Sequence, residues 1–237
     1  TLSVKQDFSH YNQEMGLQSA QTACWNSPFN YAEQALLYVP SGLPEPYQRD
    51  YIDHVVKAAL PVLRASQGRA FFLCTSLRAM QRVYELLQAA ENFAFPLLLQ
   101  GQGSRSHMLN RFRELSNAVL IGSQSFWEGV DVRGEALSLV IIDKLPFAPP
   151  DDPVLSARID KMTREGRNAF MEYQLPHAVI NLKQGAGRLI RDETDRGVLM
   201  ICDPRLITKA YGKQIWQSLP PMKRTRDLAD VEHFFAE

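Results

Sequence analysis

Short apolar runs alternate along this chain with longer segments in which apolar residues recur every three or four positions. The apolar runs occupy residues 70–74, 95–99, 118–121, 137–142 and 197–202, and the helical patterns cover residues 47–65, 77–90, 106–115, 152–165 and 176–190. Runs that are apolar at every position suit strands buried on both faces. Their alternation with helices therefore predicts an α/β fold, a parallel sheet of five strands with helices on both faces.

The net charge and the polarity of the chain limit how it could bind nucleic acid or a membrane. The chain has 237 residues, and its 26 Lys and Arg are matched by 26 Asp and Glu, so the net charge is zero. A neutral chain has no overall attraction to nucleic acid or to an anionic membrane, so any such contact must be built locally. The longest uncharged stretch, residues 15–32, is too polar for a membrane span.

The three cysteines, Cys24, Cys74 and Cys202, form no Cys-x-x-Cys pair and have no neighbouring His. This pattern predicts small buried thiols, no metal site and a reducing cytoplasm. The chain begins without Met, and residues 1–17 carry charges where a signal peptide needs an apolar run. We therefore expect a fragment of a longer cytoplasmic protein.

Both ends of the chain differ in composition from the region between them. Residues 1–40 are predicted to be a linker that leads into the main domain, residues 41–222. Residues 223–237 begin with a basic cluster and continue as an acidic stretch with an apolar face at helical spacing. This tail is either a helix docked on its own domain or a docking site for a partner. Because aromatic and Arg side chains are favoured interface anchors, the partner-binding candidates are Arg224, Thr225, Phe234 and Phe235.

The most informative segment contains one amide and two guanidinium groups. At about 100° per residue, Gln184, Arg188 and Arg191 fall at 0°, about 40° and about −20° around a helix, so they share one stripe. Two cations three residues apart repel each other, and glycines such as Gly187 destabilise a helix. A triphosphate would compensate, because Arg offers phosphate a planar fork of donors and Gly187 permits close approach. The alternative is a pair of surface arginines beside the carboxylates of residues 192–195.

A polar loop, residues 123–134, follows the third apolar run. Ligands of open parallel sheets bind beyond the carboxyl ends of the strands, so this loop is well placed for a site. Glu128 and Asp131 offer acceptors to ribose hydroxyls or to the arginine stripe. In the alternative interpretation Phe126 and Trp127 are core residues and the glycines of the loop are turn residues. Donors for the phosphates of a nucleic-acid backbone are Ser123, Gln124 and Ser125.

Another candidate phosphate site follows the first apolar run. Ser76 suits a helix N-cap, and the backbone N–H groups of a helix N-terminus also bind phosphate, so the two roles are compatible. Arg78 lies two residues further on. No Gly-x-x-x-x-Gly-Lys-Ser/Thr loop occurs in the sequence, so the chain lacks the usual cradle for ATP and Mg²⁺.

In their order and spacing, these segments resemble the second motor domain of superfamily 2 DNA helicases of the XPD and DinG type, closest to the bacterial DinG-like branch. Residues 184–191 resemble helicase motif VI, residues 125–134 motif V and residues 72–80 motif IV. Ser27-Pro28-Phe29 and Leu145-Pro146-Phe147 are further signatures of the branch, and Thr1-Leu2 resembles the end of motif III, which closes the first motor domain.

The resemblance implies a RecA-like domain that completes an ATP site together with a first motor domain. Arg188 and Arg191 would contact the γ-phosphate, with Arg191 as the arginine finger, and Gln184 would help place the phosphate or the attacking water. Residues near the nucleotide would be Glu128, Gly129, Asp131 and Gly187.

The resemblance also implies 5′-to-3′ movement on single-stranded or forked DNA in repair or replication. ATP and Mg²⁺ would be shared with the absent first motor domain, where the family usually carries a 4Fe-4S cluster, so the isolated chain is predicted to be inactive and free of iron. DNA contacts are expected from Ser76, Arg78, Ser123, Gln124 and Ser125. Expected protein partners are a DNA polymerase III accessory subunit or a single-stranded DNA-binding protein. The competing interpretation is a non-catalytic module that docks such a partner through its tail.

Overall fold

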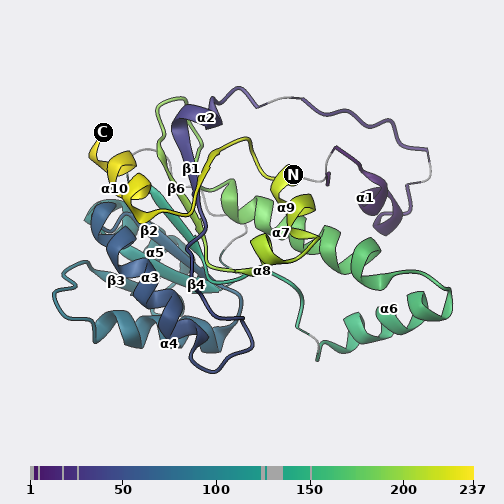
Figure 1. The fold of residues 1–237 in the computed structure, drawn as a ribbon, viewed down its shortest axis with the longest axis horizontal. Helices are drawn as coiled ribbons and strands as arrows, with labels where there is room; N and C mark the ends of the chain where they lie inside the picture. The colour runs from purple at the N-terminus through teal and green to yellow at the C-terminus, as the bar shows by residue number, and fades with distance from the viewer. Residues whose placement is uncertain are drawn as a thin grey trace.

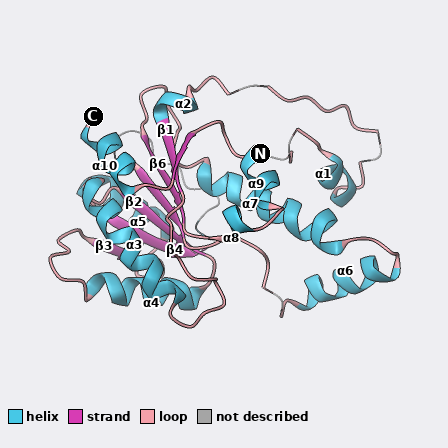
Figure 2. Cartoon of the chain, viewed as in Figure 1, coloured by secondary structure: helices cyan, strands magenta, loops and turns pink. Residues whose placement is uncertain are grey.

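A seven-stranded sheet forms a layer between helices, in the left half of the view in Figures 1 and 2. The computed structural model describes residues 3–4, 6–17, 19–25, 27–123, 126, 136–149 and 151–237. Within this part the strand order is β3-β4-β2-β5-β6-β1-β7, and each neighbouring pair is parallel. The strands are β1 (Ala35–Tyr38), β2 (Ala70–Cys74), β3 (Leu97–Leu99), β4 (Val119–Ser123), β5 (Leu139–Ile142), β6 (Gly197–Ile201) and β7 (Lys223–Thr225).

Helices cover both faces of the sheet, because successive residues of a buried strand point to opposite sides. In β2, Phe72 belongs to one apolar cluster, whereas Phe71 and Leu73 belong to the other. The first face is covered by α3 (Tyr51–Ala65), α4 (Leu77–Gln88) and α10 (Leu228–Ala236). The second is covered by α5 (Arg105–Leu115), α7 (Leu175–Ala186), α8 (Arg205–Thr208) and α9 (Gly212–Ser218). The prediction of a parallel sheet with helices on both faces is confirmed.

The remaining helical elements lie mostly beside these layers. They are α1 (Ser9–Glu14), α2 (Tyr31–Gln34), α6 (Pro153–Arg164) and a π-helical turn, Phe170–Gln174, which leads into α7. Figure 1 shows α1 and α6 on the side of the molecule away from the sheet, and residues of both line one pocket. None of the described helices combines the length and the apolar character that a membrane crossing requires.

Two strands were not predicted. Each of the five apolar runs contains a strand, but β1 and β7 come from the segments on either side of the expected domain. β7 has the polar sequence Lys-Arg-Thr, since an edge strand needs no apolar pattern and is protected by charge. β1 is only four residues long and lies between β6 and β7. Residues 1–40 and 223–237 therefore each supply a strand, while the domain boundaries at residues 40 and 222 stay a prediction.

One cysteine differs from expectation. Cys74 and Cys202 are buried as predicted, but Cys24 is exposed. Residues 19–25 run along the surface between α1 and α2 and join neither apolar cluster, so no core is available there to bury a thiol.

The C-terminal helix packs on its own domain. α10 contacts α3, β1 and β7, and Val231 is completely buried. Phe234 and Phe235 are half-buried against the cluster that α3 and α4 cover. This packing agrees with the docked-helix interpretation of the tail.

We expect Val231→Ala to lower the free energy of unfolding by about 2 kcal/mol, because it removes two buried methyl groups and leaves a cavity. The matched control is Glu232→Ala, since Glu232 is the exposed neighbour on the same helix. Urea denaturation of both variants measures the difference. Equal stabilities would contradict the packing of α10 described above.

Candidate functional site

The predicted site residues lie at opposite edges of the sheet. Ser76 and Arg78 follow the carboxyl end of β2, whereas the segment with Arg188 and Arg191 precedes the amino end of β6. Because the strands are parallel, these segments emerge from different edges. The two ends of the polar loop also lie at opposite edges of the sheet. Ser123 is the last residue of β4, and Ala136 lies just before β5.

The prediction that Gln184, Arg188 and Arg191 share one stripe of a continuous helix was wrong. α7 ends at Ala186, and Gly187 and Arg188 form a turn. The backbone N–H of Arg188 donates to Gly185 and that of Leu189 to Ala186, which tightens the chain after the last helical turn. Gln184 is therefore helical, whereas both arginines lie beyond the helix.

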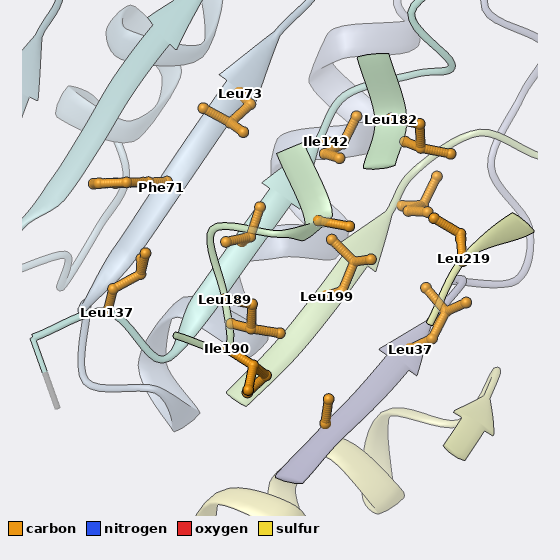
Figure 3. Packing of buried hydrophobic residues seen from close by; sticks show 14 of the residues in the cluster. Leu37, Phe71, Leu73, Leu137, Ile142, Leu182, Leu189, Ile190, Leu199 and Leu219 are labelled. Atoms are coloured by element: carbon orange, nitrogen blue, oxygen red, sulfur yellow. The ribbon is translucent and has the colours of Figure 1, made fainter. Parts of the chain in front are cut away.

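A buried dipeptide positions the two arginines instead. Leu189 and Ile190 are only 2% and 3% exposed, and Figure 3 shows both against the sheet near Leu199 of β6. Arg188 and Arg191 flank this dipeptide; each is half-buried, with its Nε atom shielded from solvent. A Cβ atom at Gly197 would lie 2.6 Å from Cδ1 of Leu189, so the glycine at the start of β6 makes room for the dipeptide.

Two polar side chains brace the loop that follows. The carboxylate of Asp195, itself buried, accepts hydrogen bonds from the backbone N–H groups of Arg191 at 2.7 Å and Asp192 at 2.9 Å. Nε2 of Gln34, just before β1, lies 3.0, 2.9 and 2.9 Å from the carbonyl oxygens of residues 192, 193 and 195. Gln34 was not predicted from the sequence, because no local pattern connects it with a loop so far along the chain. Together these contacts hold the backbone of Arg191 in one position.

At the carboxyl edge, a buried carboxylate joins two loops. Oδ1 of Asp143 accepts from the backbone N–H groups of Thr75 at 2.9 Å and Lys144 at 2.8 Å, and Oδ2 accepts from the Thr75 hydroxyl at 3.2 Å. Burial raises the pKa of Asp143 to about 6, although Lys144 and these hydrogen bonds counteract the rise. Asp143 thus ties the loop after β5 to the loop after β2.

Tyr51 and Asp203 extend this network. The Tyr51 hydroxyl, at the start of α3, lies 2.7 Å from the carbonyl oxygen of Asp143 and 2.6 Å from that of Cys202. Burial raises the pKa of Tyr51, so it stays a neutral donor. Asp203 accepts from the backbone N–H of Leu145 at 2.8 Å and forms an ion pair with Arg205 at 2.7 Å. The loops after β2, β5 and β6 are therefore fixed to one another and to α3.

The predicted DNA-contacting residues differ in accessibility. Ser76 is exposed and caps α4 by accepting from the backbone N–H of Ala79 at 3.2 Å, and Arg78 is exposed beside it. Ser123 is only 7% exposed, and its hydroxyl donates to Oε1 of Gln100 at 3.1 Å. A phosphate would have to displace Gln100 to reach that hydroxyl. The predicted residues Gln124, Ser125, Glu128, Gly129 and Asp131 lie outside the described residues.

Within the described part of the chain, no group of three or more His, Cys, Asp or Glu side chains is arranged to hold a metal ion.

Comparisons with known proteins agree on one family. The family model of the helicase C-terminal domain matches residues 59–222. The ATP-dependent DNA helicase YoaA of Escherichia coli (strain K12) is 48% identical over 236 residues, which cover 100% of this chain and 37% of that protein. The ATP-dependent helicase DinG of Mycobacterium tuberculosis (strain ATCC 25618 / H37Rv) is 40% identical over 208 residues, 86% of this chain and 31% of that protein. The chain thus spans about a third of the length of these curated relatives.

Solved structures share the fold. The structure named XPD_APO has a TM-score of 0.61 at 20% identity and covers 82% of this chain and 40% of its own. The C-terminal domain of the DEAD-box protein Dbp5 has a TM-score of 0.51 at 18% identity over 87% of this chain and 98% of its own. The predicted RecA-like architecture is confirmed by this likeness.

The buried carboxyl group of Asp143 gives a pH-dependent prediction. Its pKa is higher in the folded state, about 6, than its ordinary value of 3.8, so its stabilising contribution is complete below pH 3.8 and is lost as the pH rises through 6. Asn at this position can accept the two backbone N–H groups and donate to the Thr75 hydroxyl without carrying a charge. We expect the stability advantage of Asp143→Asn over the native chain to grow by about 2 kcal/mol between pH 4.5 and 7.5.

Urea denaturation at several pH values measures this difference. Asp143→Ala is the control, since it removes the acceptor and should destabilise the protein across the whole range. If the free energies of unfolding of the native chain and of Asp143→Asn changed in parallel with pH, the raised pKa of Asp143 would be contradicted.

Proposed function

Because this chain belongs to the family of helicase C-terminal domains of the DinG and XPD type, we propose that it is the second motor domain of an ATP-dependent DNA helicase. The observation that carries the proposal is the placement of Arg188 and Arg191 on either side of the buried Leu189-Ile190 dipeptide. Such an anchored pair is prepared to receive an anion, because its backbone is already fixed before the anion arrives.

The donors at the amino edge fit the phosphates of ATP. Two guanidinium groups offer planar forks of N–H donors, and Gln184 adds a neutral amide from the last turn of α7. ATP with Mg²⁺ supplies the phosphoanhydride bond whose hydrolysis releases free energy. In this proposal Arg191 stabilises the charge on the γ-phosphate as an arginine finger, Arg188 also holds that phosphate, and Gln184 orients the phosphate or the attacking water. Gly187, Glu128, Gly129 and Asp131 complete the nucleotide contacts.

In the same proposal, the carboxyl edge of the sheet binds DNA. Exposed Ser76 and Arg78 contact backbone phosphates, together with Gln124, Ser125 and, after displacement of Gln100, Ser123. These contacts are weak in the isolated chain and sensitive to salt, because phosphate binding releases counterions.

The activity of the complete protein requires a first motor domain that shares ATP and Mg²⁺. We propose 5′-to-3′ movement on single-stranded or forked DNA during repair or replication in the bacterial cytoplasm, with a 4Fe-4S cluster in that first domain. The isolated chain neither hydrolyses ATP nor binds iron.

Arg191→Ala should lower the rate of DNA-stimulated ATP hydrolysis by the complete protein about 10³-fold or more, the range for a lost arginine finger. The fold should persist, because Asp195 binds the backbone N–H of residue 191, which alanine retains. A steady-state phosphate-release assay measures the rate, and circular dichroism measures the fold.

Arg164→Ala is the matched control, since Arg164 is an exposed arginine on α6. Hydrolysis near the native rate by Arg191→Ala would remove the arginine finger from the proposal.

A second candidate function is partner docking through the tail, which the exposure of Arg224 and the partial exposure of Phe234 and Phe235 favour. Arg224 and Thr225 also have internal contacts. The Arg224 guanidinium lies 4.6 Å from the centroid of the Trp216 ring, and the Thr225 hydroxyl donates to the Asp230 carboxylate.

If the tail docks a DNA polymerase III accessory subunit or a single-stranded DNA-binding protein, Arg224→Ala should weaken that complex about tenfold or more, as expected for an Arg anchor. ATP hydrolysis by the complete protein should be unchanged. Biolayer interferometry measures the affinity, with Arg111→Ala on α5 as the control. Native affinity for both partners would contradict docking through Arg224.

A further inference from the structure

A groove of about 560 Å³ opens at the carboxyl edge, beside the network around Asp143. One wall is residues 46–52, the segment that leads into α3 together with the first two residues of that helix. The other wall is Ser76 with the first part of α4, and Lys144 also lines the groove. Its volume lies within the range of about 300–1,000 Å³ that is usual for ligand sites. Only Ser76 and Arg78 of its lining were singled out in the sequence.

The groove carries an excess of positive charge. Its lining contains four cationic side chains, Arg49, Arg78, Arg82 and Lys144, against one carboxylate, Glu85. Arg82 is held by Asp53 through two hydrogen bonds of 2.9 and 2.7 Å. Among the residues that the structure describes, no hydrogen bond or ion pair engages the side chains of the other three cations, although the charge of Lys144 also acts on the buried Asp143 carboxyl group. Three cations gathered without such partners favour an anionic ligand.

The groove also presents an aromatic ring to solvent. Tyr47 is 83% exposed, whereas most large apolar side chains of this chain are buried in the two clusters. An exposed ring beside cations is the combination that single-stranded nucleic acids use, since bases stack on the ring while phosphates meet the charges.

Both walls are fixed before any ligand arrives. The hydroxyl of Tyr51 binds the carbonyl oxygens of residues 143 and 202, which anchors the end of the segment that carries Tyr47 and Arg49. Asp143 binds the backbone of Thr75 and Lys144 and so fixes the start of α4 relative to Lys144. Such preorganisation reduces the entropy that binding must overcome.

We propose that this groove is a stacking site for single-stranded DNA, in which one base lies on Tyr47 and the phosphates on either side meet Arg49, Arg78 and Lys144. The inference rests on the proposed function and extends it. It adds Tyr47, Arg49 and Lys144 to the residues that contact DNA. It also means that the motor domain binds DNA through a base as well as through the backbone. Because every base has a stacking face, the site tolerates any sequence. It discriminates against duplex DNA, whose bases are already stacked on each other.

The test is binding of the complete protein to an oligothymidylate that carries one 2-aminopurine, followed by fluorescence anisotropy and 2-aminopurine emission. Tyr47→Ala should weaken binding about tenfold and change the 2-aminopurine emission of the complex, because the base loses the ring on which it stacks. Tyr47→Phe should retain both properties. Arg49→Ala and Lys144→Ala should each lower the slope of log affinity against log salt concentration by about one.

The matched controls are Trp25→Ala, an exposed aromatic residue between α1 and α2, and Arg111→Ala on α5; neither lines the groove. Native binding by Tyr47→Ala, while Arg78→Ala binds weakly, would overturn the stacking site and leave the proposed function standing. Absence of any single-stranded DNA binding by the native protein would overturn both. An equal loss of affinity for blunt duplex DNA in Tyr47→Ala would overturn the stacking role of Tyr47.

Discussion

Burial of the sheet on both faces is the constraint on which the rest of this structure depends. Every residue of β2, β5 and β6 is buried, so the faces have no place for a polar site. Parallel strands also send their loops to only two edges, and any binding chemistry of the sheet must be assembled there. The amino edge carries Arg188 and Arg191, and the carboxyl edge carries the groove with Tyr47 and Lys144.

At both edges of the sheet, the loop that carries the cations is held in place by the same kind of interaction. Each uses a buried carboxylate to hold backbone N–H groups of the loop that carries the cations. Asp195 does this for Arg191, and Asp143 for Thr75 and Lys144. Hydrogen bonds to a buried carboxylate rigidify its loop. In Asp143 burial raises the pKa of the carboxyl group, and the hydrogen bonds from Thr75 and Lys144 offset only part of that rise. The acidic residue Asp195, close to the arginines, therefore holds the backbone of their loop in addition to contributing negative charge.

Prediction from sequence succeeded where a local pattern reports a local structure. The apolar runs located five strands, and Ser76 was recognised as a helix cap. Prediction failed where the helical periodicity was extended past Gly187. The periodicity through residue 190 suggested one helix, yet α7 ends at Ala186, directly before Gly187, which disfavours helix. Leu189 and Ile190 owe their apolar character to burial after the helix has ended. The polar strand β7 had no pattern to detect, since its pairing with β1 involves only the backbone.

The sequence by itself determined the fold class, the family resemblance and the identity of the arginine pair, because apolar runs and motif residues are written in short stretches of chain. Only the tertiary structure decided which distant residues support them. Gln34 meets the loop before β6, and Tyr51 meets the loops after β5 and β6, across long separations in the chain. Such contacts depend on how strands are ordered in the sheet, and strand order follows from the packing of the whole domain, which no local periodicity encodes.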